Sequence, residues 1–397
     1  MRCFQADIIY PVSAAPIPNG VVVTENDGTI VAVGGKELLE AYPGLPIEVL
    51  SGVLCPGFIN THCHLELSCM KGHIQQGTGM VGFISEFVKK RNLFTAEESK
   101  EAIQHAEKEM LDNGIVAVGD IANTNHTFEQ KSKANLYYHT FLEAFDLHPS
   151  RAAESFLSIR KLREELVHFI PGSASQSSVV PHAPYTMSPA LHEKISAYAH
   201  QQGSILSIHS LESAAEDELF RKGTGPFTAM FAAMKMDHSW FKAPGQSSLP
   251  STLSYYNRNK KLLLVHNTYA TVADMQLPSG NLQLFWATCP KANLYIESRL
   301  PDYEAMISQK LKVTIGTDSL ASNNCLSMLE EMKTISAAHP SIPLATLIQW
   351  ACLNGAEFLG IDKQYGSVEK GKKPGLVLIS GMEAGKLTAG SKVKRII

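Results

Sequence analysis

The sequence predicts an α/β protein, a (β/α)8 barrel of the TIM type with a small β-sandwich domain built from both ends of the chain. Three observations support this prediction. Eight short apolar runs recur in the middle of the chain between amphipathic stretches, a pattern typical of parallel strands buried on both faces. The two ends consist instead of β-branched runs and tight turns. Nearly every central run closes with a polar residue, as expected where barrel strands open onto a functional face.

The two ends of the chain share one strand-like pattern. Residues 1–55 contain ADIIYPV, GVVVTENDGTIVAVG and PIEVLSGVLCP, with Asn-Gly and Asp-Gly at the turns. Residues 365–397 contain GLVLISG and KVKRII. Neither end has enough strands to be stable alone, so we expect them to pair into one β-sandwich domain, with the barrel between them at 56–364.

The barrel strands are expected at the eight apolar runs, which are 57–64, 115–120, 136–143, 178–183, 205–209, 262–266, 284–289 and 313–318. A clear helix between the first two runs begins after the cap-like Thr95 and stops at Gly114. The stretch 210–261 is longer than a simple crossover, so we expect extra helices there, covering one face of the barrel.

Composition excludes several classes of protein. Of 397 residues, 44% are hydrophobic and 18% charged, which allows a large core and excludes general disorder. The 35 basic and 38 acidic residues nearly balance, which argues against nucleic acid or an anionic membrane as the main partner. No apolar run approaches the ~18 residues of a membrane span, and no signal peptide is evident. Seven cysteines without close pairing indicate reduced thiols in a cytoplasmic protein.

Polar residues at the strand ends indicate where the chemistry lies. These residues are His62, His64, Asp120, Glu143, His182, His209, His266 and Asp318. His62 and His64 are two positions apart on one strand, so both imidazoles point to the same side while Cys63 points to the other. A single histidine at a strand end is more often structural, but this many on one rim favour a site for a divalent metal such as Zn²⁺.

Other motifs carry less weight. Gly77 to Gly82 match G-x-G-x-x-G, but no strand precedes them, which argues against a dinucleotide site. His64 and Glu66 match half of the cytidine-deaminase signature, yet no P-C-x-x-C follows. His105, His192 and His200 fall within helical patterns and are expected on solvated helix faces.

Several segments in order resemble one family. They are PGFINTHCHLELS, VVPHAPYTMSP, SIHSLES, LLVHNTY, ATCPKANLYI, IGTDSLASN and GSVEKGKKPGLVLI. Together they are similar to the amidohydrolase superfamily, in its branch of adenosine-type, guanine and chlorotriazine deaminases and chlorohydrolases, over almost the whole chain. The sequence departs from the family at Pro374-Gly375, where Ala-Asp is usual, in a structural position.

The resemblance implies one divalent metal ion per chain, Zn²⁺ with Fe²⁺ as the alternative. Its ligands would be His62, His64, His209 and Asp318. Pro181 and His182 occupy the place where a bridging lysine would serve a second metal, which favours a mononuclear site.

The resemblance also implies roles around the metal. His266 and Asp318 would orient the attacking water, and Glu212 would carry protons to the ring and the leaving group. His182 would bind the substrate. Independently of the resemblance, we expect Glu143 at its strand end, and the apolar Met70 and Trp240 in the loops above the barrel, to bind the substrate as well.

The reaction expected is hydrolytic deamination of a small amino-substituted heterocycle with release of ammonia. A 6-aminopurine nucleoside derivative of the aminodeoxyfutalosine, methylthioadenosine or S-adenosylhomocysteine type is favoured, and the segment HLELS is most similar to deaminases of aminodeoxyfutalosine. Hydrolysis of another C–N or C–Cl bond, as in guanine or a triazine, remains an alternative. A non-catalytic scaffold is a third, disfavoured because the ligand residues are intact. Members of the branch often form homodimers, and the sequence leaves that assembly open.

Overall fold

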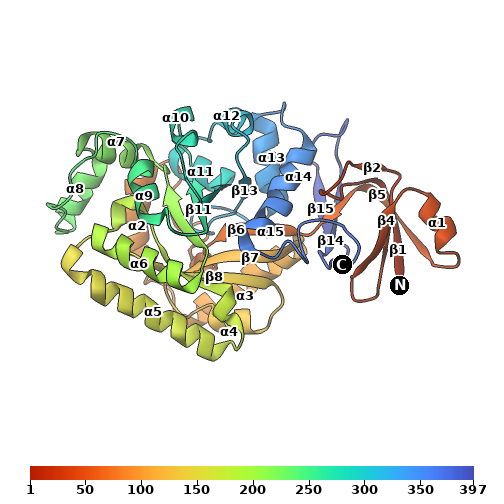
Figure 1. Ribbon diagram of the computed structural model, residues 1–397, viewed down its shortest axis with the longest axis horizontal. Helices are drawn as coiled ribbons and strands as arrows, with labels where there is room; N and C mark the ends of the chain where they lie inside the picture. The colour runs from red at the N-terminus through yellow and green to blue at the C-terminus, as the bar shows by residue number, and fades with distance from the viewer.

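The computed structural model describes residues 1–397 and arranges the strands in three sheets. One sheet joins the two ends of the chain, and the other two are purely parallel. In Figure 1 both termini lie beside the sheet that joins the chain ends. This sheet is at the opposite end of the molecule from α7 (Ala214–Lys222) and α8 (Pro226–Ala233).

The terminal sheet has seven strands in the order β15-β14-β5-β1-β3-β4, with β2 paired to β1. Its members are β1 (Arg2–Ile9), β2 (Ile17–Pro18), β3 (Val21–Thr24), β4 (Ile30–Gly34), β5 (Ile47–Pro56), β14 (Leu376–Ser380) and β15 (Lys392–Arg395). The predicted pairing of the two chain ends is confirmed, because β14 runs antiparallel to β5, with Leu378 opposite Leu54. The short helix α1 (Glu37–Ala41) follows β4.

All eight predicted barrel strands are present. One of the two parallel sheets has the strand order β6-β7-β8-β9, and the other has the order β10-β11-β12-β13. Their bounds are β6 (Phe58–Cys63), β7 (Ile115–Ala122), β8 (Tyr137–Ala144), β9 (Ser177–Pro181), β10 (Leu206–Ser210), β11 (Lys261–His266), β12 (Gln283–Thr288) and β13 (Val313–Ile315).

Backbone hydrogen bonds link these two sheets at both of their edges. Beside β9 and β10, the N–H of His209 donates to the carbonyl of His182 at 2.9 Å. Beyond β13, the N–H groups of Thr317 and Asp318 donate to the carbonyl of His62 at 3.1 and 3.0 Å. Cys63 and Asp318 also form an isolated parallel bridge. These contacts bring the ends of β6, β10 and β13 to one place.

The helices separate the parallel strands as predicted. The expected helix after Thr95 is α3 (Ala96–Asp112), and Thr95 and Glu98 form a reciprocal capping box at its start. The stretch 210–261 contains three helices, α7, α8 and α9 (Ser248–Tyr256), so the prediction of extra helices is confirmed. The others are α2 (Gly79–Lys90), α4 (Phe128–Ser132), α5 (Ala152–Phe169), α6 (Pro189–Gln202), α10 (Val272–Met275), α11 (Pro290–Glu297), α12 (Tyr303–Ser308), α13 (Met328–Ala338), α14 (Leu344–Ala351) and α15 (Leu353–Leu359). Short 3₁₀ turns cover Leu65–Met70, Pro149–Arg151, Ser173–Gln176 and Pro184–Thr186. No helix has the length and hydropathy that crossing a bilayer requires.

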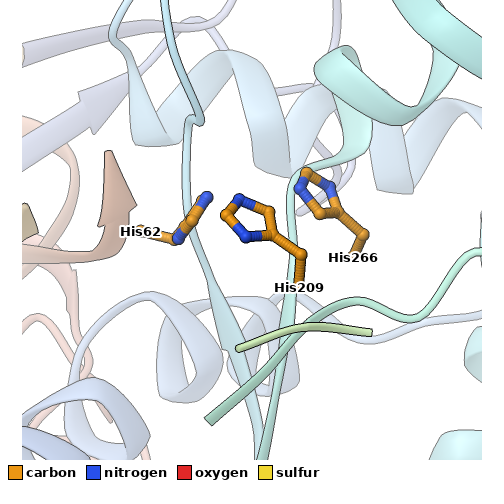
Figure 2. A group of neighbouring side chains, drawn as sticks. All are labelled: His62, His209 and His266. Atoms are coloured by element: carbon orange, nitrogen blue, oxygen red, sulfur yellow. The ribbon is translucent and has the colours of Figure 1, made fainter. Parts of the chain in front are cut away.

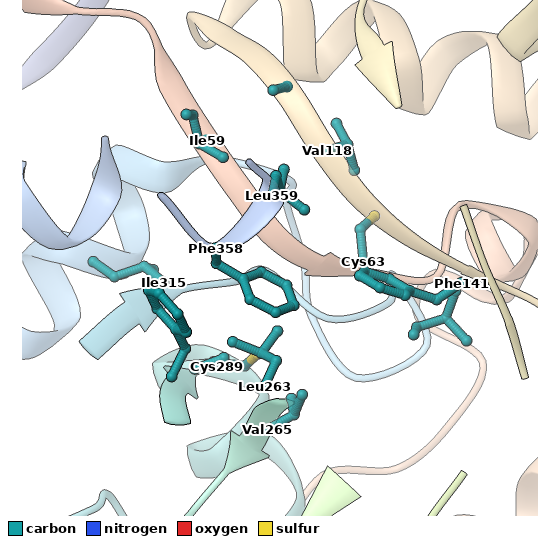
Figure 3. Packing of buried hydrophobic residues seen from close by; sticks show 14 of the residues in the cluster. Ile59, Cys63, Val118, Phe141, Leu263, Val265, Cys289, Ile315, Phe358 and Leu359 are labelled. Carbon is teal, nitrogen blue, oxygen red and sulfur yellow. The ribbon is translucent and has the colours of Figure 1, made fainter. Parts of the chain in front are cut away.

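The main core is a single apolar cluster between the parallel strands and the surrounding helices. Figure 3 shows part of it, including Cys63 of β6 and Phe358 of α15. Cys63 is fully buried in this cluster, and none of the seven cysteines forms a disulfide. One prediction is wrong: His192 on α6 is buried, not solvated, because its Nδ1 pairs with the Tyr256 hydroxyl at 2.7 Å.

Candidate active site

Two imidazoles leave the end of β6 side by side. His62 is fully buried and His64 nearly so, and their Nε2 atoms lie 3.1 Å apart. The backbone after β13 passes close to this pair: a Cβ on Gly316 would lie 2.8 Å from both the Cβ and the carbonyl oxygen of His62. Glycine is therefore required there to let Asp318 reach the histidines.

Asp318 completes a set of three converging donor atoms. Its Oδ1 lies 3.5 Å from His62 Nε2 and 3.4 Å from His64 Nε2. In a tetrahedral zinc site with bonds of ~2.0–2.2 Å, neighbouring ligand atoms lie ~3.3–3.6 Å apart. The three donor atoms are thus spaced as ligands of one ion, and the residues fit a divalent metal.

His209 stands next to this set at the end of β10. Figure 2 shows its ring between those of His62 and His266, and donor atoms of the three lie within 4.8 Å of one another. His209 Nδ1 donates to the carbonyl oxygen of His182 at 2.8 Å. This contact fixes the proton on Nδ1 and leaves Nε2 free as a ligand, the usual way in which a neighbouring acceptor orients a metal-binding histidine.

Burial sets the protonation of these groups. It lowers the pKa of His209 well below its ordinary value, and the neighbouring His182 and His62 act in the same direction. Burial alone would raise the pKa of Asp318, but the neighbouring His62, His64 and His266 bring it well below the usual range. Neutral imidazoles and an ionised carboxylate are the states in which these side chains bind metal ions.

Glu212 and His266 form a second pair beside the first. Glu212 Oε1 lies 3.3 Å from His266 Nε2, and the buried Tyr185 hydroxyl donates to Glu212 Oε2 at 3.3 Å. Burial raises the pKa of Glu212 well above its ordinary value, and the charges of Asp318 and Glu216 add to this. Glu212 is therefore a buried carboxyl group that holds its proton more tightly than an exposed glutamate does.

The loop that carries Glu212 is held by a residue that the sequence analysis missed. Glu216, in the first turn of α7, accepts hydrogen bonds from the backbone N–H of Leu211 at 3.1 Å and of Glu212 at 2.9 Å. Leu211 has a left-handed backbone with φ of 49°, so this turn needs such support. The sequence signal was ambiguous, because an acid in a first helical turn is common anyway.

Glu143 and His182, both expected to bind substrate, border the histidines. Glu143 is buried, with Oε1 at 3.5 Å from His209 Nδ1, and its Oε2 accepts a hydrogen bond from Asn123 at 3.3 Å. His182 Nδ1 pairs with the Thr186 hydroxyl at 2.8 Å.

The two loop residues expected to bind substrate lie in apolar clusters. Met70 packs in a small cluster with Ile74 and Ala321. Trp240 is partly buried in the cluster around Phe227, with its ring edge-on to Phe241. The structure therefore brings together the histidine and carboxylate residues of the prediction but not these two.

Asp120, another polar residue near a strand end, has a different environment. Its Oδ2 lies 2.6 Å from Lys131 Nζ, with both side chains almost fully buried, and its Oδ1 accepts a hydrogen bond from the N–H of Leu65. Asp120 thus supports the backbone next to His64 and is not part of the converging donor set.

The comparisons with known proteins identify the family of this chain and agree with its fold. The chain belongs to the Amidohydrolase family, whose model matches residues 53–395. It is 27% identical over 371 residues to an adenosine deaminase of Helicobacter pylori and, over the same length, 27% identical to an aminodeoxyfutalosine deaminase of Deinococcus radiodurans. Each alignment covers 90% of this chain and 86% of the relative.

Solved structures show the same fold. The aminofutalosine deaminase of Helicobacter pylori in complex with methylthio-coformycin superposes with a TM-score of 0.79 at 24% identity, covering 98% of this chain and 94% of that one. An adenosine deaminase of Xanthomonas campestris with bound zinc gives a TM-score of 0.73 at 23% identity, covering 95% of this chain and 84% of that one.

Proposed function

We propose that this chain is a metal-dependent hydrolase that deaminates a 6-aminopurine nucleoside derivative and releases ammonia. The observation that carries the proposal is the convergence of His62, His64 and Asp318 at ligand spacing, with the proton-holding Glu212 close by. The names of the two relatives at 27% identity, an adenosine deaminase and an aminodeoxyfutalosine deaminase, support the same reaction class.

A single divalent ion, Zn²⁺ or Fe²⁺, would be held by His62, His64, His209 and Asp318. Two groups of converging donor atoms that share His62, one with His64 and Asp318 and one with His209 and His266, support this choice. The bound zinc of the adenosine deaminase with a similar fold supports it as well. When bound, such an ion acts as a Lewis acid that activates water at neutral pH.

The protein's own residues would move the protons. A ring carbon bearing an amino group resists attack by water until the adjacent ring nitrogen gains a proton. Glu212 would donate this proton, a role that its raised pKa supports. His266, at 3.3 Å from Glu212, would accept a proton from the attacking water and hold its orientation with Asp318. His182 and Glu143, which border the histidines, would bind the purine.

The apolar cluster above the site would cover the rest of the substrate. Tyr185 stacks on Phe227 of α8 with ring centroids 4.3 Å apart, so the α7–α8 segment packs directly over the Glu212 contact. Trp240 belongs to the same cluster, and Met70 packs in a separate one with Ile74 and Ala321. Neither contacts the histidines, and we propose that both contact the outer part of the substrate.

We also assign the architecture predicted from the sequence. The hydrogen bonds at both edges of the two parallel sheets support one closed (β/α)8 barrel at 56–364. The pairing of β14 with β5 supports a separate small β-domain of residues 1–55 and 365–397.

The test is kcat/KM for ammonia release from free adenine, adenosine, AMP, methylthioadenosine and aminodeoxyfutalosine, with metal-replete enzyme. An adenine nucleoside with an uncharged or carboxylated 5′ extension should be the best substrate, because the cluster over the site consists of apolar side chains, which do not pair with a phosphate. Highest activity on AMP or on free adenine would contradict the proposal.

A further inference from the structure

Asn293 is a buried side chain on α11 that none of the roles above employs. It is 2% exposed, and its Oδ1 lies 2.8 Å from Nδ1 of His266. The other side of the imidazole, Nε2, is buried without a hydrogen-bond partner and faces Glu212 Oε1 at 3.3 Å. Asn293, His266 and Glu212 therefore form a continuous row of buried polar groups.

The contact determines which nitrogen of His266 carries the proton. A carbonyl oxygen accepts hydrogen bonds, so Nδ1 must present its hydrogen to Asn293 Oδ1, and in a neutral imidazole Nε2 then keeps a lone pair. That lone pair points to the carboxyl group of Glu212. With the opposite tautomer, an oxygen and a nitrogen lone pair would face each other at 2.8 Å in a buried site.

The helix that carries Asn293 is anchored at its start. The backbone N–H of Lys291, in the first turn of α11, donates to Glu331 Oε2 at 2.9 Å. The Asn323 side chain donates to Glu331 Oε1 at 2.7 Å and to the carbonyl of Thr317 at 2.8 Å. The start of α11 is thereby tied to the segment that leads into Asp318.

The backbone under His266 needs such external support. His266 has φ of 74° and Asn267 φ of 54°, both in the left-handed region that residues other than glycine rarely adopt. The Asn267 side chain secures the main chain by donating to the carbonyl oxygens of Leu264 and Ala287, at 2.7 and 3.0 Å. For the imidazole ring itself, the hydrogen bond to Asn293 is the one that fixes its rotation.

We propose that Asn293 is a positioning residue that holds His266 as the Nδ1–H tautomer, with Nε2 directed at Glu212 and the reacting atoms. The inference rests on the proposed deamination. It adds Asn293, which would touch neither the metal nor the substrate, to the residues whose loss should slow the reaction.

The kinetic test compares Asn293→Ala with Asn293→Asp. The alanine variant should lose ~10²-fold in kcat, the scale of a misplaced general base, with KM changed by less than about threefold. The aspartate variant should return to within about tenfold of wild type, because its carboxylate accepts the same hydrogen bond. Both should keep the metal. Asn259→Ala is the matched control, because Asn259 is equally buried but bonds to Ser196 on α6, outside this row.

A second measurement separates this inference from the proposed function. In zinc-loaded protein with ¹⁵N-labelled histidine, His266 should carry its proton on Nδ1 in wild type and lose that preference in Asn293→Ala, whatever the substrate. An unchanged tautomer, wild-type kcat in Asn293→Ala, or an aspartate variant as slow as the alanine variant would each overturn the inference. A wild-type enzyme that deaminates nothing in the panel would refute the proposed function alone, since the tautomer is read without substrate.

Discussion

Two buried polar clusters lie at neighbouring strand ends of this protein and differ in how their charges are balanced. In the first, Asp120 and Lys131 neutralise each other at 2.6 Å, and Lys131 donates a further hydrogen bond to Thr140. In the second, the Asp318 carboxylate faces the imidazoles of His62 and His64 at 3.5 and 3.4 Å, and burial lowers the pKa of both histidines. A buried charge needs a counter-charge, which Lys131 gives to Asp120, so the second cluster is the one that points to a cation from outside the chain.

Asp120 and Asp318 are both acidic residues near the end of a predicted barrel strand, but only Asp318 lies among the converging donor atoms. A polar residue at the end of a barrel strand marks a functional face only where the fold gives it no partner of opposite charge. Lys131 lies on α4, far enough from Asp120 in sequence that no local motif joins them. The comparison predicts that changes in the second cluster reduce catalysis, whereas changes in the first reduce stability.

The largest effect is expected in the second cluster, from Glu212→Gln. Glutamine keeps the shape of the side chain but has no proton to donate, so kcat should fall ~10²–10⁴-fold while the metal stays bound. Steady-state kinetics with metal analysis would test this, with the exposed Glu97→Gln as control. Near-normal turnover in a metal-replete Glu212→Gln enzyme would remove Glu212 from the mechanism.

In the first cluster, Lys131→Met should destabilise the fold by ~3–5 kcal/mol, because it leaves the Asp120 carboxylate buried without its partner. The Asp120→Asn, Lys131→Met double variant should recover part of the loss. Lys108→Met, which breaks the exposed pair with Asp112 on α3, should stay close to wild type. Urea unfolding gives all three values, and equal losses in Lys131→Met and Lys108→Met would contradict the distinction.

A smaller effect should appear as pH dependence at Glu216, which supports the Glu212 loop. Burial raises the pKa of Glu216 from 4.5 to about 7, so the folded state holds this proton more tightly than the unfolded state. Its stabilising contribution is complete below pH 4.5 and is lost as pH rises through 7, a loss of about 3 kcal/mol. As the pH rises through 7, the free energy of unfolding of the metal-free protein should fall by about 3 kcal/mol less in Glu216→Gln than in wild type. Parallel pH curves for the two proteins would show that Glu216 does not titrate in this way.

Much of the fold followed from local patterns. The eight strands were predictable because each is a short apolar run bounded by turns, and α3 because Thr95 and Glu98 mark its start. The donor residues His62, His64 and Asp318 were predictable because histidine and aspartate at strand ends are unusual and face one rim.

The residues missed by the sequence analysis act through partners distant in the chain. Asn293 meets His266 from another helix, Tyr185 meets Glu212 from the loop after β9, and His192 is buried by Tyr256 on α9. Asparagine and tyrosine are common in helices and turns, so their types alone carried no signal. Tertiary packing decides these contacts, and one sequence does not encode them in any local spacing.

The central claim is that the histidine cluster, and not the Asp120–Lys131 pair, is built around one metal ion. Metal content per chain, measured on purified wild type, His209→Ala and Lys131→Met, tests it most directly. The account predicts about one divalent ion in wild type and in folded Lys131→Met, and little or none in His209→Ala, which removes one of the four proposed ligands. Two tightly bound ions in wild type, or a full complement in His209→Ala, would contradict it.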